Sequence, residues 1–287
     1  MFALLRKELK TYFLTPAGWI FLAVFLLISG LLFSLQLVFP QNSQYSGFLG
    51  GLIFLFLLVV PLLTMRIFTD EKRFQTDQLL LTSPVNLWGI VLGKYIAALC
   101  VFLITVAVTF IYPLLLSFHG KLDWSMIIGT YFGFLLVGAS FIAIGVFVSQ
   151  AAEGAVGAAI LTFCALTVTF IVDFLQPYMP SSETAGLVWV AILMALALFR
   201  LFSTGRNPFL TALIFIIFAV VLLVLWFVDK GLFSGLIGRS LVWVSLTRRF
   251  GSFAMGILRL DSVVYYLSFS GFFLFLTVQG LEKRRWS

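Results

Sequence analysis

The run AGWIFLAVFLLISGLLFSLQLV at residues 17–38 contains no charged side chain. An α-helix needs about 20 apolar residues to cross the roughly 30 Å of hydrocarbon in a bilayer, and this run has that length. Similar runs follow at about residues 48–65, 90–118, 126–148, 155–175, 186–202, 209–228 and 263–278. The sequence therefore predicts an all-α fold, a polytopic transmembrane helical bundle that forms one domain over residues 1–287. The expected number of spans is about eight, with six or seven as the alternatives.

The composition supports a membrane protein. The chain is 62% hydrophobic and 10% charged, whereas soluble domains have about 25% charged residues. The net charge of +7 comes from residues that flank apolar runs, so it favours membrane orientation over nucleic-acid binding. Cys100 and Cys164 lie inside apolar runs and form no metal or disulfide pattern.

The first 15 residues predict an amphipathic helix that lies in the membrane interface. One side is apolar and the other is charged, with the residues Phe2, Leu5, Leu9, Tyr12 and Phe13 opposite Arg6, Lys7, Glu8 and Lys10. The run at 17–38 is too long for the apolar region of a signal peptide, so we expect it to remain as an anchor.

The Lys and Arg residues favour a cytoplasmic N-terminus, because positively charged segments next to a membrane span are retained in the cytoplasm. Eight spans put the C-terminus there too, whereas seven spans, which result if residues 186–202 do not cross, put it outside. Both arrangements place the same number of the 18 Lys and Arg residues in the cytoplasm. The distribution of positive charge therefore does not distinguish eight spans from seven. The basic tail of Lys283, Arg284 and Arg285 directly follows the last run. This favours a cytoplasmic C-terminus in a multi-pass protein of the cell membrane.

Residues 66–88 form the longest polar loop of the N-terminal half, and it begins RIFTDEKRFQTDQLLLTSP. Its charges alternate in sign, as on a solvated helix surface. A connection between two helices can be about five residues long. This longer loop is therefore either a solvated interfacial helix or a docking element for another protein, and its residues alone favour neither.

The same loop resembles the first cytoplasmic loop of type-2 ABC permeases, and is most similar to those of the gliding-motility type. The resemblance rests on Asp70-Glu71-Lys72-Arg73, on Thr76-Asp77-Gln78-Leu79-Leu80-Leu81-Thr82-Ser83-Pro84 and on Ile90-Val91-Leu92-Gly93-Lys94. Gln75 stands where the family often has Gly, and Gln78 where it often has Glu. The C-terminal stretch from Arg249 to Thr277 is also similar. Residues 183–228 have no counterpart in shorter relatives with six spans, and look like an inserted helical pair.

The resemblance implies an exporter permease subunit that pairs with a second permease subunit, as a homodimer or a heterodimer. It also implies docking on a separate ATP-binding subunit through the amphipathic N-terminal helix and the first cytoplasmic loop. The loop residues expected to couple to that subunit are Arg66, Asp70, Glu71, Lys72, Arg73, Thr76, Asp77, Gln78, Leu79, Leu80, Leu81, Thr82, Ser83 and Pro84. Of these, Glu71, Arg73 and Asp77 are expected to be polar contacts and residues 79–81 an apolar face. Charge reversal at Glu71 and Arg73 is expected to uncouple ATP hydrolysis from transport while the protein stays folded.

The nucleotide is expected on the partner. The run Gly89-Ile-Val-Leu-Gly93-Lys94-Tyr95 has the wrong spacing for a phosphate-binding loop and lacks the Ser or Thr that would hold Mg²⁺. We therefore expect no catalytic, cofactor or metal site on this chain, with ATP and Mg²⁺ held by the other subunit.

Two other classes of function compete with this interpretation. A secondary transporter driven by an ion gradient needs ionisable groups deep in the bilayer, and its candidates here are Glu153 and Asp173. An intramembrane enzyme is disfavoured because the sequence lacks a nucleophile elbow and has a single histidine, His119. Residues 229–261 are expected to be extracytoplasmic, and their Lys230, Arg239, Arg248, Arg249 and Arg259 could attract an anionic cargo.

Overall fold

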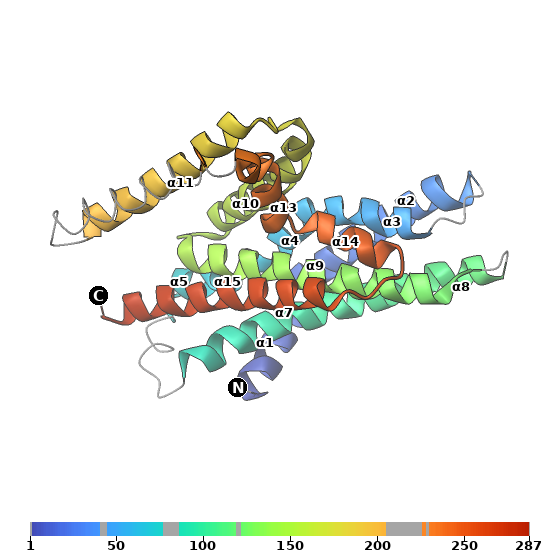
Figure 1. Ribbon diagram of the computed structural model, residues 1–287. Helices are drawn as coiled ribbons and strands as arrows, with labels where there is room; N and C mark the ends of the chain where they lie inside the picture. Colours follow the sequence, from blue (N-terminus) through green and yellow to red (C-terminus); the bar gives the residue numbers. More distant parts are fainter. Residues whose placement is uncertain are drawn as a thin grey trace. The chain divides into compact units, whose positions relative to one another are not determined.

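The computed structural model describes residues 2–40, 45–76, 86–118, 122–204, 226–227 and 230–286. All regular elements in these ranges are helices, as the sequence predicts (Figure 1). The chain forms two compact units. Unit 1 consists of Met1–Thr169 and Leu246–Ser287, and unit 2 of Phe170–Ser245.

Unit 1 holds most of the helices. In chain order they are α1 (Phe2–Leu14), α2 (Pro16–Phe33), α3 (Tyr45–Leu52), α4 (Phe56–Thr64), α5 (Thr69–Arg73), α7 (Leu87–Thr109), α8 (Ile111–Ser117), α9 (Trp124–Ala151), the first part of α10 (Ala155–Leu175), α14 (Thr247–Ala254) and α15 (Leu260–Trp286). A π-helical turn at Ser34–Val38 extends α2, and a 3₁₀ turn at Ile53–Leu55 joins α3 to α4.

Six helical segments within the described residues are long and apolar enough to cross a membrane. They are Gly18–Val38, Gly47–Arg73, Leu87–Ser117, Trp124–Ala151, Ala155–Tyr178 and Leu260–Arg285. Each coincides with an apolar run found in the sequence. The chain is therefore a multi-pass membrane protein, but the count of about eight spans is not confirmed. Residues 186–202 fall in α11 (Glu183–Thr204), whose side chains the structure describes only to Ala195, and residues 209–225 lie outside the described part.

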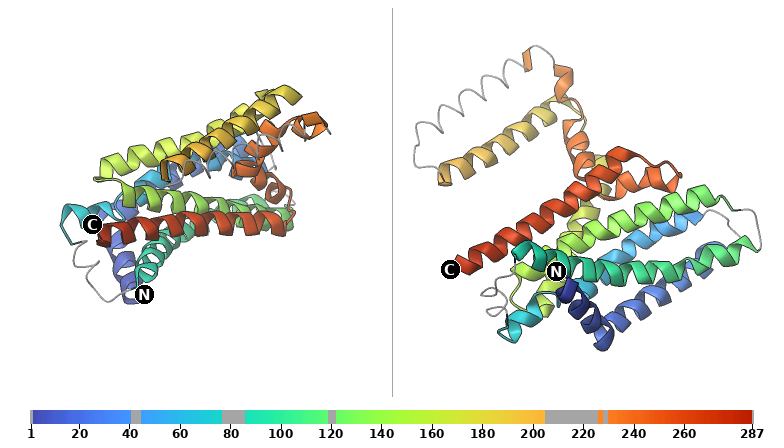
Figure 2. Two further views of the ribbon diagram at one scale, coloured as in Figure 1. Left: turned by 60° about the vertical axis from the view of Figure 1, so that its left-hand side comes forward. Right: turned by 90° about the horizontal axis from the view of Figure 1, so that it is seen from below.

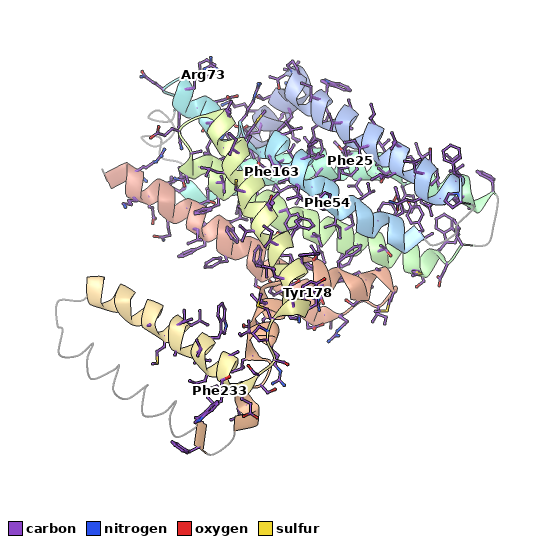
Figure 3. All side chains as sticks on the ribbon, turned by 90° about the horizontal axis from the view of Figure 1, so that it is seen from above. Phe25, Phe54, Arg73, Phe163, Tyr178 and Phe233 are labelled. Atoms are coloured by element: carbon purple, nitrogen blue, oxygen red, sulfur yellow. The ribbon has the colours of Figure 1, made fainter. Side chains whose placement is uncertain are left out.

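Helix α9 is the central element of unit 1, and most of its residues are buried. It contacts α15, α14, α4 and α7. Glycines allow this close approach, because a Cβ at Gly138 would lie 2.4 Å from the Phe102 ring and one at Gly145 would lie 2.3 Å from Thr64 Oγ1. Within the bundle Phe25 is buried, whereas Phe54 is exposed; both residues are labelled in Figure 3.

Helices α9 and α15 lie side by side and run parallel (Figures 1 and 2). Ser140 Oγ donates to Tyr266 O at 3.3 Å, and further along both helices a Cβ at Gly280 would meet the Gln150 side chain. Because α10 follows α9 back across, an even number of crossings must separate α10 from α15. The seven-span alternative is therefore wrong, since it has one crossing there and would make α15 antiparallel to α9.

Unit 2 contains the end of α10, the 3₁₀ turn Gln176–Tyr178, α11, the 3₁₀ turn Lys230–Phe233 and α13 (Leu236–Val244). Helix α11 is joined to α13 by a hydrogen bond in which Trp189 Nε1 donates to Ser240 Oγ at 3.1 Å. Gly235 precedes α13 at φ +65°, a conformation that favours glycine. The sequence predicts an inserted pair of helices at residues 183–228. Helix α11 lies at the position of the first helix of this pair, and the second helix lies almost entirely outside the described residues. The predicted segment 229–261 is divided between the two units.

Candidate functional site: the α5 end of unit 1

One end of unit 1 gathers α1, α5, the start of α7 and the end of α9 around a polar cluster. Helix α5 is a single short turn at the end of the second span, and Arg73 lies at its tip (Figure 3). Asp70 and Glu71 occupy its first turn and Lys72 and Arg73 its last. This order suits the helix dipole, which favours acids at the start and bases at the end.

A buried ion-pair cluster joins α5 to α7 and α1. The Lys94 side chain of α7 is 1% exposed, and its Nζ lies 2.7 Å from Glu71 Oε1 and 3.1 Å from Glu8 Oε1. The same ammonium donates to Ile67 O at 2.8 Å and lies 5.2 Å from the centre of the Phe68 ring. Both carboxylates are largely buried. Lys94 therefore holds three separate chain segments together through one charge.

The neighbouring residue of α5, Lys72, contacts α9 instead. Its ammonium donates to Gln150 O and to Ala152 O, the latter at 2.6 Å. The carbonyls of the last helical turn have no partner within the helix, and a cation there also interacts favourably with the helix dipole. Just before α5, Phe68 N donates to Ser149 Oγ at 3.2 Å. Lys72 and Ser149 thus attach α5 to the end of α9.

Helix α1 is attached to the second span by Tyr12, whose hydroxyl donates to Leu63 O at 3.0 Å. Burial, with Glu8 and Asp70 nearby, raises the pKa of Tyr12 above its usual range. The hydroxyl therefore stays protonated and remains a donor at neutral pH.

A polar groove of about 420 Å³ lies between α5 and the turn that joins α9 to α10. On the α5 side it is lined by Arg66, Thr69, Asp70, Lys72, Arg73 and Phe74, and on the other side by Glu153, Gly154, Ala155 and Val156. Arg66, Arg73 and Glu153 are exposed. The groove therefore offers charges of both signs on adjoining walls.

The sequence-predicted docking residues separate into three groups. Arg66, Arg73 and Thr76 are exposed, and Arg66, Asp70, Lys72 and Arg73 line the groove. Glu71 pairs with Lys94 of α7, and the Lys72 ammonium also binds the end of α9. The others, Asp77, Gln78, Leu79, Leu80, Leu81, Thr82, Ser83 and Pro84, lie outside the described residues. Gln75 has φ 55°, the left-handed conformation in which glycine is favoured at a helix end. This accounts for the Gly that the family pattern often has at that position.

Sequence reasoning missed the roles of Glu8, Lys94 and Ser149. A usable signal existed for Lys94, which is the only charged residue of the predicted run at 90–118. A charge inside a span needs a partner or a path to water. Glu8 and Ser149 carry no such signal, because both are ordinary residues near helix ends.

Of the two acids considered for ion-gradient transport, Glu153 lines the groove and Asp173 does not. Glu153 is exposed in the turn that follows α9, and Asp173 lies near the end of α10, in unit 2. Within the ranges that the structure describes, no group of three or more His, Cys, Asp or Glu residues is placed to hold a metal ion.

A comparison with protein-family models identifies the family of this chain. The model described as ABC-2 family transporter protein matches residues 2–179, which is more than half of the chain. The chain belongs to this family. Its matched region contains α1, α5 and the whole polar cluster, as well as five of the six spans. A search of curated proteins gave no match. The chain is therefore a membrane permease of an ABC transporter, the component that crosses the bilayer.

Proposed function

We propose that this permease is the transmembrane subunit of an ATP-driven exporter, and that a separate ATP-binding subunit docks in the groove beside α5. The observation that carries the proposal is the double attachment of α5. One face of this helix lines a charged groove, while Glu71 and Lys72 bind α7 and α9. A force applied at the groove would therefore reach two spans directly.

The distribution of charge supports a cytoplasmic position for this end. Unit 1 carries at this end Arg6, Lys7, Lys10, Arg66, Lys72, Arg73, Lys94, Lys283, Arg284 and Arg285. The end at which α14 packs carries Arg248, Arg249 and Arg259. Positive residues are retained on the cytoplasmic side. Both termini of the chain are then cytoplasmic in the cell membrane, and α1 lies along the inner interface.

The even number of crossings between α10 and α15 supports a second part of the proposal. Either none or both of the segments at 186–202 and 209–228 cross the bilayer. Because both are apolar, we propose that they cross as a pair, which gives eight spans. The resemblance further supports a second permease subunit in the complex.

The roles of the loop residues are narrower than the resemblance alone implies. Arg66, Asp70, Arg73 and Thr76 are proposed as docking contacts, together with the loop from Asp77 to Pro84. Glu71 and Lys72 are proposed to transmit movement rather than to dock, because their charged groups are engaged within the permease. Glu153 is added as a docking contact on the opposite wall of the groove.

Affinity purification of the full-length chain in mild detergent tests the proposal. We expect an ATP-binding subunit in equimolar amount, with ATPase activity that vanadate inhibits. Arg73→Glu should reduce the retained partner about tenfold, since a charge reversal at a rim contact costs on the order of 1–2 kcal/mol. Arg284→Glu is the matched control, because Arg284 is also exposed and basic but does not line the groove.

Two outcomes would contradict the proposal. The first is purification of the chain with no ATP-binding partner. The second is full retention of that partner by the double variant Arg73→Glu, Glu153→Lys, which inverts charge on both walls of the groove.

A further inference from the structure

The outer surface of α1 carries a groove that the docking proposal does not use. Residues one turn apart form two rows along the helix, Leu5, Leu9 and Phe13 in one and Arg6, Lys10 and Leu14 in the other. The hollow along these rows is open, is lined by α1 alone and has a volume of about 670 Å³. One wall is apolar and the other begins with two cations.

The opposite face of α1 is fully engaged with the bundle. Glu8 pairs with Lys94, and Tyr12 donates to Leu63 O. Leu4 packs against Gly93, where a Cβ would lie 3.2 Å from Leu4 Cδ2. The only acid of α1 is therefore turned inward, and the outward face keeps the positive charges.

Arg6 and Lys10 form an uncompensated pair on that face. Both are exposed, and in the part of the chain that the structure describes neither makes an ion pair. Like charges four residues apart on a helix lie about 5–6 Å from each other at Cβ and are mutually destabilising. An anion placed between them would remove this repulsion.

The groove is continuous with a surface that faces lipid. Trp19, at the start of the first span, donates from Nε1 to Phe13 O at 2.8 Å, and its ring meets the Phe13 ring edge-on with centres 6.1 Å apart. Trp19 is 59% exposed, and Leu27 further along α2 is 68% exposed. Tryptophan at this level of a span marks the headgroup region of the bilayer. The Phe13 end of the groove therefore opens toward acyl chains.

From this arrangement we propose that the α1 groove is a binding site for one anionic phospholipid of the leaflet that α1 faces. The phosphate lies between Arg6 and Lys10, and an acyl chain follows Leu5, Leu9 and Phe13 toward Trp19. Anionic lipid is preferred over zwitterionic lipid because the site supplies two positive charges and no acceptor. The proposal concerns the permease alone and does not depend on an ATP-binding subunit.

Native mass spectrometry of the purified full-length chain tests the site, with dioleoylphosphatidylglycerol and dioleoylphosphatidylcholine as probes. Wild type should retain one phosphatidylglycerol in preference to phosphatidylcholine. The double variant Arg6→Gln, Lys10→Gln should weaken that retention about tenfold or more, since each basic residue near a membrane surface contributes a several-fold effect. Size-exclusion chromatography verifies that the variant stays folded.

A matched control separates a site from general surface charge. The variant Arg284→Gln, Arg285→Gln removes the same charge from the exposed end of α15 and should retain phosphatidylglycerol as wild type does. Three results would overturn the proposal: unchanged retention in the α1 variant, an equal loss in the control, or equal retention of the two lipids by wild type.

Discussion

Replacing Lys94 by Met removes the one positive charge of the cluster while keeping an unbranched side chain of similar length. Glu71 and Glu8 approach Lys94 Nζ at 2.7 Å and 3.1 Å, and their side chains are only 14% and 13% exposed. Breaking a buried ion pair by removal of one partner costs about 3–5 kcal/mol, because an uncompensated charge stays buried. Here two carboxylates are left facing each other, so we expect the upper part of that range.

Thermal unfolding in detergent, followed by size-exclusion chromatography, measures this cost. With about 2–4 °C per kcal/mol for a chain of this size, a cost of about 4–5 kcal/mol should lower the midpoint by roughly 8–20 °C. The triple variant Lys94→Met, Glu8→Gln, Glu71→Gln removes all three charges, and should regain most of the lost stability because no charge is then buried without a partner. An unchanged midpoint in Lys94→Met, or no recovery in the triple variant, would show that the three side chains do not form a cluster.

Three further predictions concern the same helices. Lys72→Met should lower the unfolding midpoint by a few degrees without abolishing assembly, because the carbonyls at the end of α9 lose a charged donor worth about 1.5–3 kcal/mol; an unchanged midpoint would refute this attachment. Gln75→Gly should raise the midpoint slightly, since φ 55° costs a non-glycine residue on the order of 1 kcal/mol, and a lowered midpoint would contradict the left-handed assignment. In a background without native cysteines, Thr76→Cys should react with a membrane-impermeant maleimide only in inside-out vesicles and Ser125→Cys only in intact cells; the reverse pattern would invert the proposed orientation.

The membrane fold was predictable because the length of an apolar run is read directly from the sequence. All six spans coincide with predicted runs, although the second extends to Arg73, well beyond the predicted end at residue 65. After a turn at residues 65–68 the chain becomes helical again as α5, in which Glu71 pairs with Lys94 of α7 and Lys72 binds the end of α9. Apolar content alone cannot locate such an end, since the stabilising contacts come from residues distant in the sequence.

The direction in which each loop residue points was not predictable. Glu71, Lys72 and Arg73 are consecutive, and successive residues of a helix point about 100° apart. A five-residue helix is too short to show a periodic pattern, so nothing in the sequence distinguishes the inward Glu71 from the outward Arg73. The expectation that charge reversal at Glu71 leaves the protein folded is revised for this reason. A cation at position 71 would lie against the buried Lys94.

The same three consecutive residues suggest how docking and transmission can be separated by experiment. Arg73 faces the groove, Lys72 contacts α9 and Glu71 contacts α7, so one short helix presents a different partner at each position. If α5 transmits movement, Arg73 variants should change the amount of bound ATP-binding subunit at constant activity per complex. Lys72 variants should instead leave the amount bound unchanged and alter the ATPase activity of each complex. If the Arg73 and Lys72 variants reduce binding of the ATP-binding subunit equally, α5 is only a docking surface. In that case Lys72 would contribute to binding in the same way as Arg73 and would not transmit movement to α9.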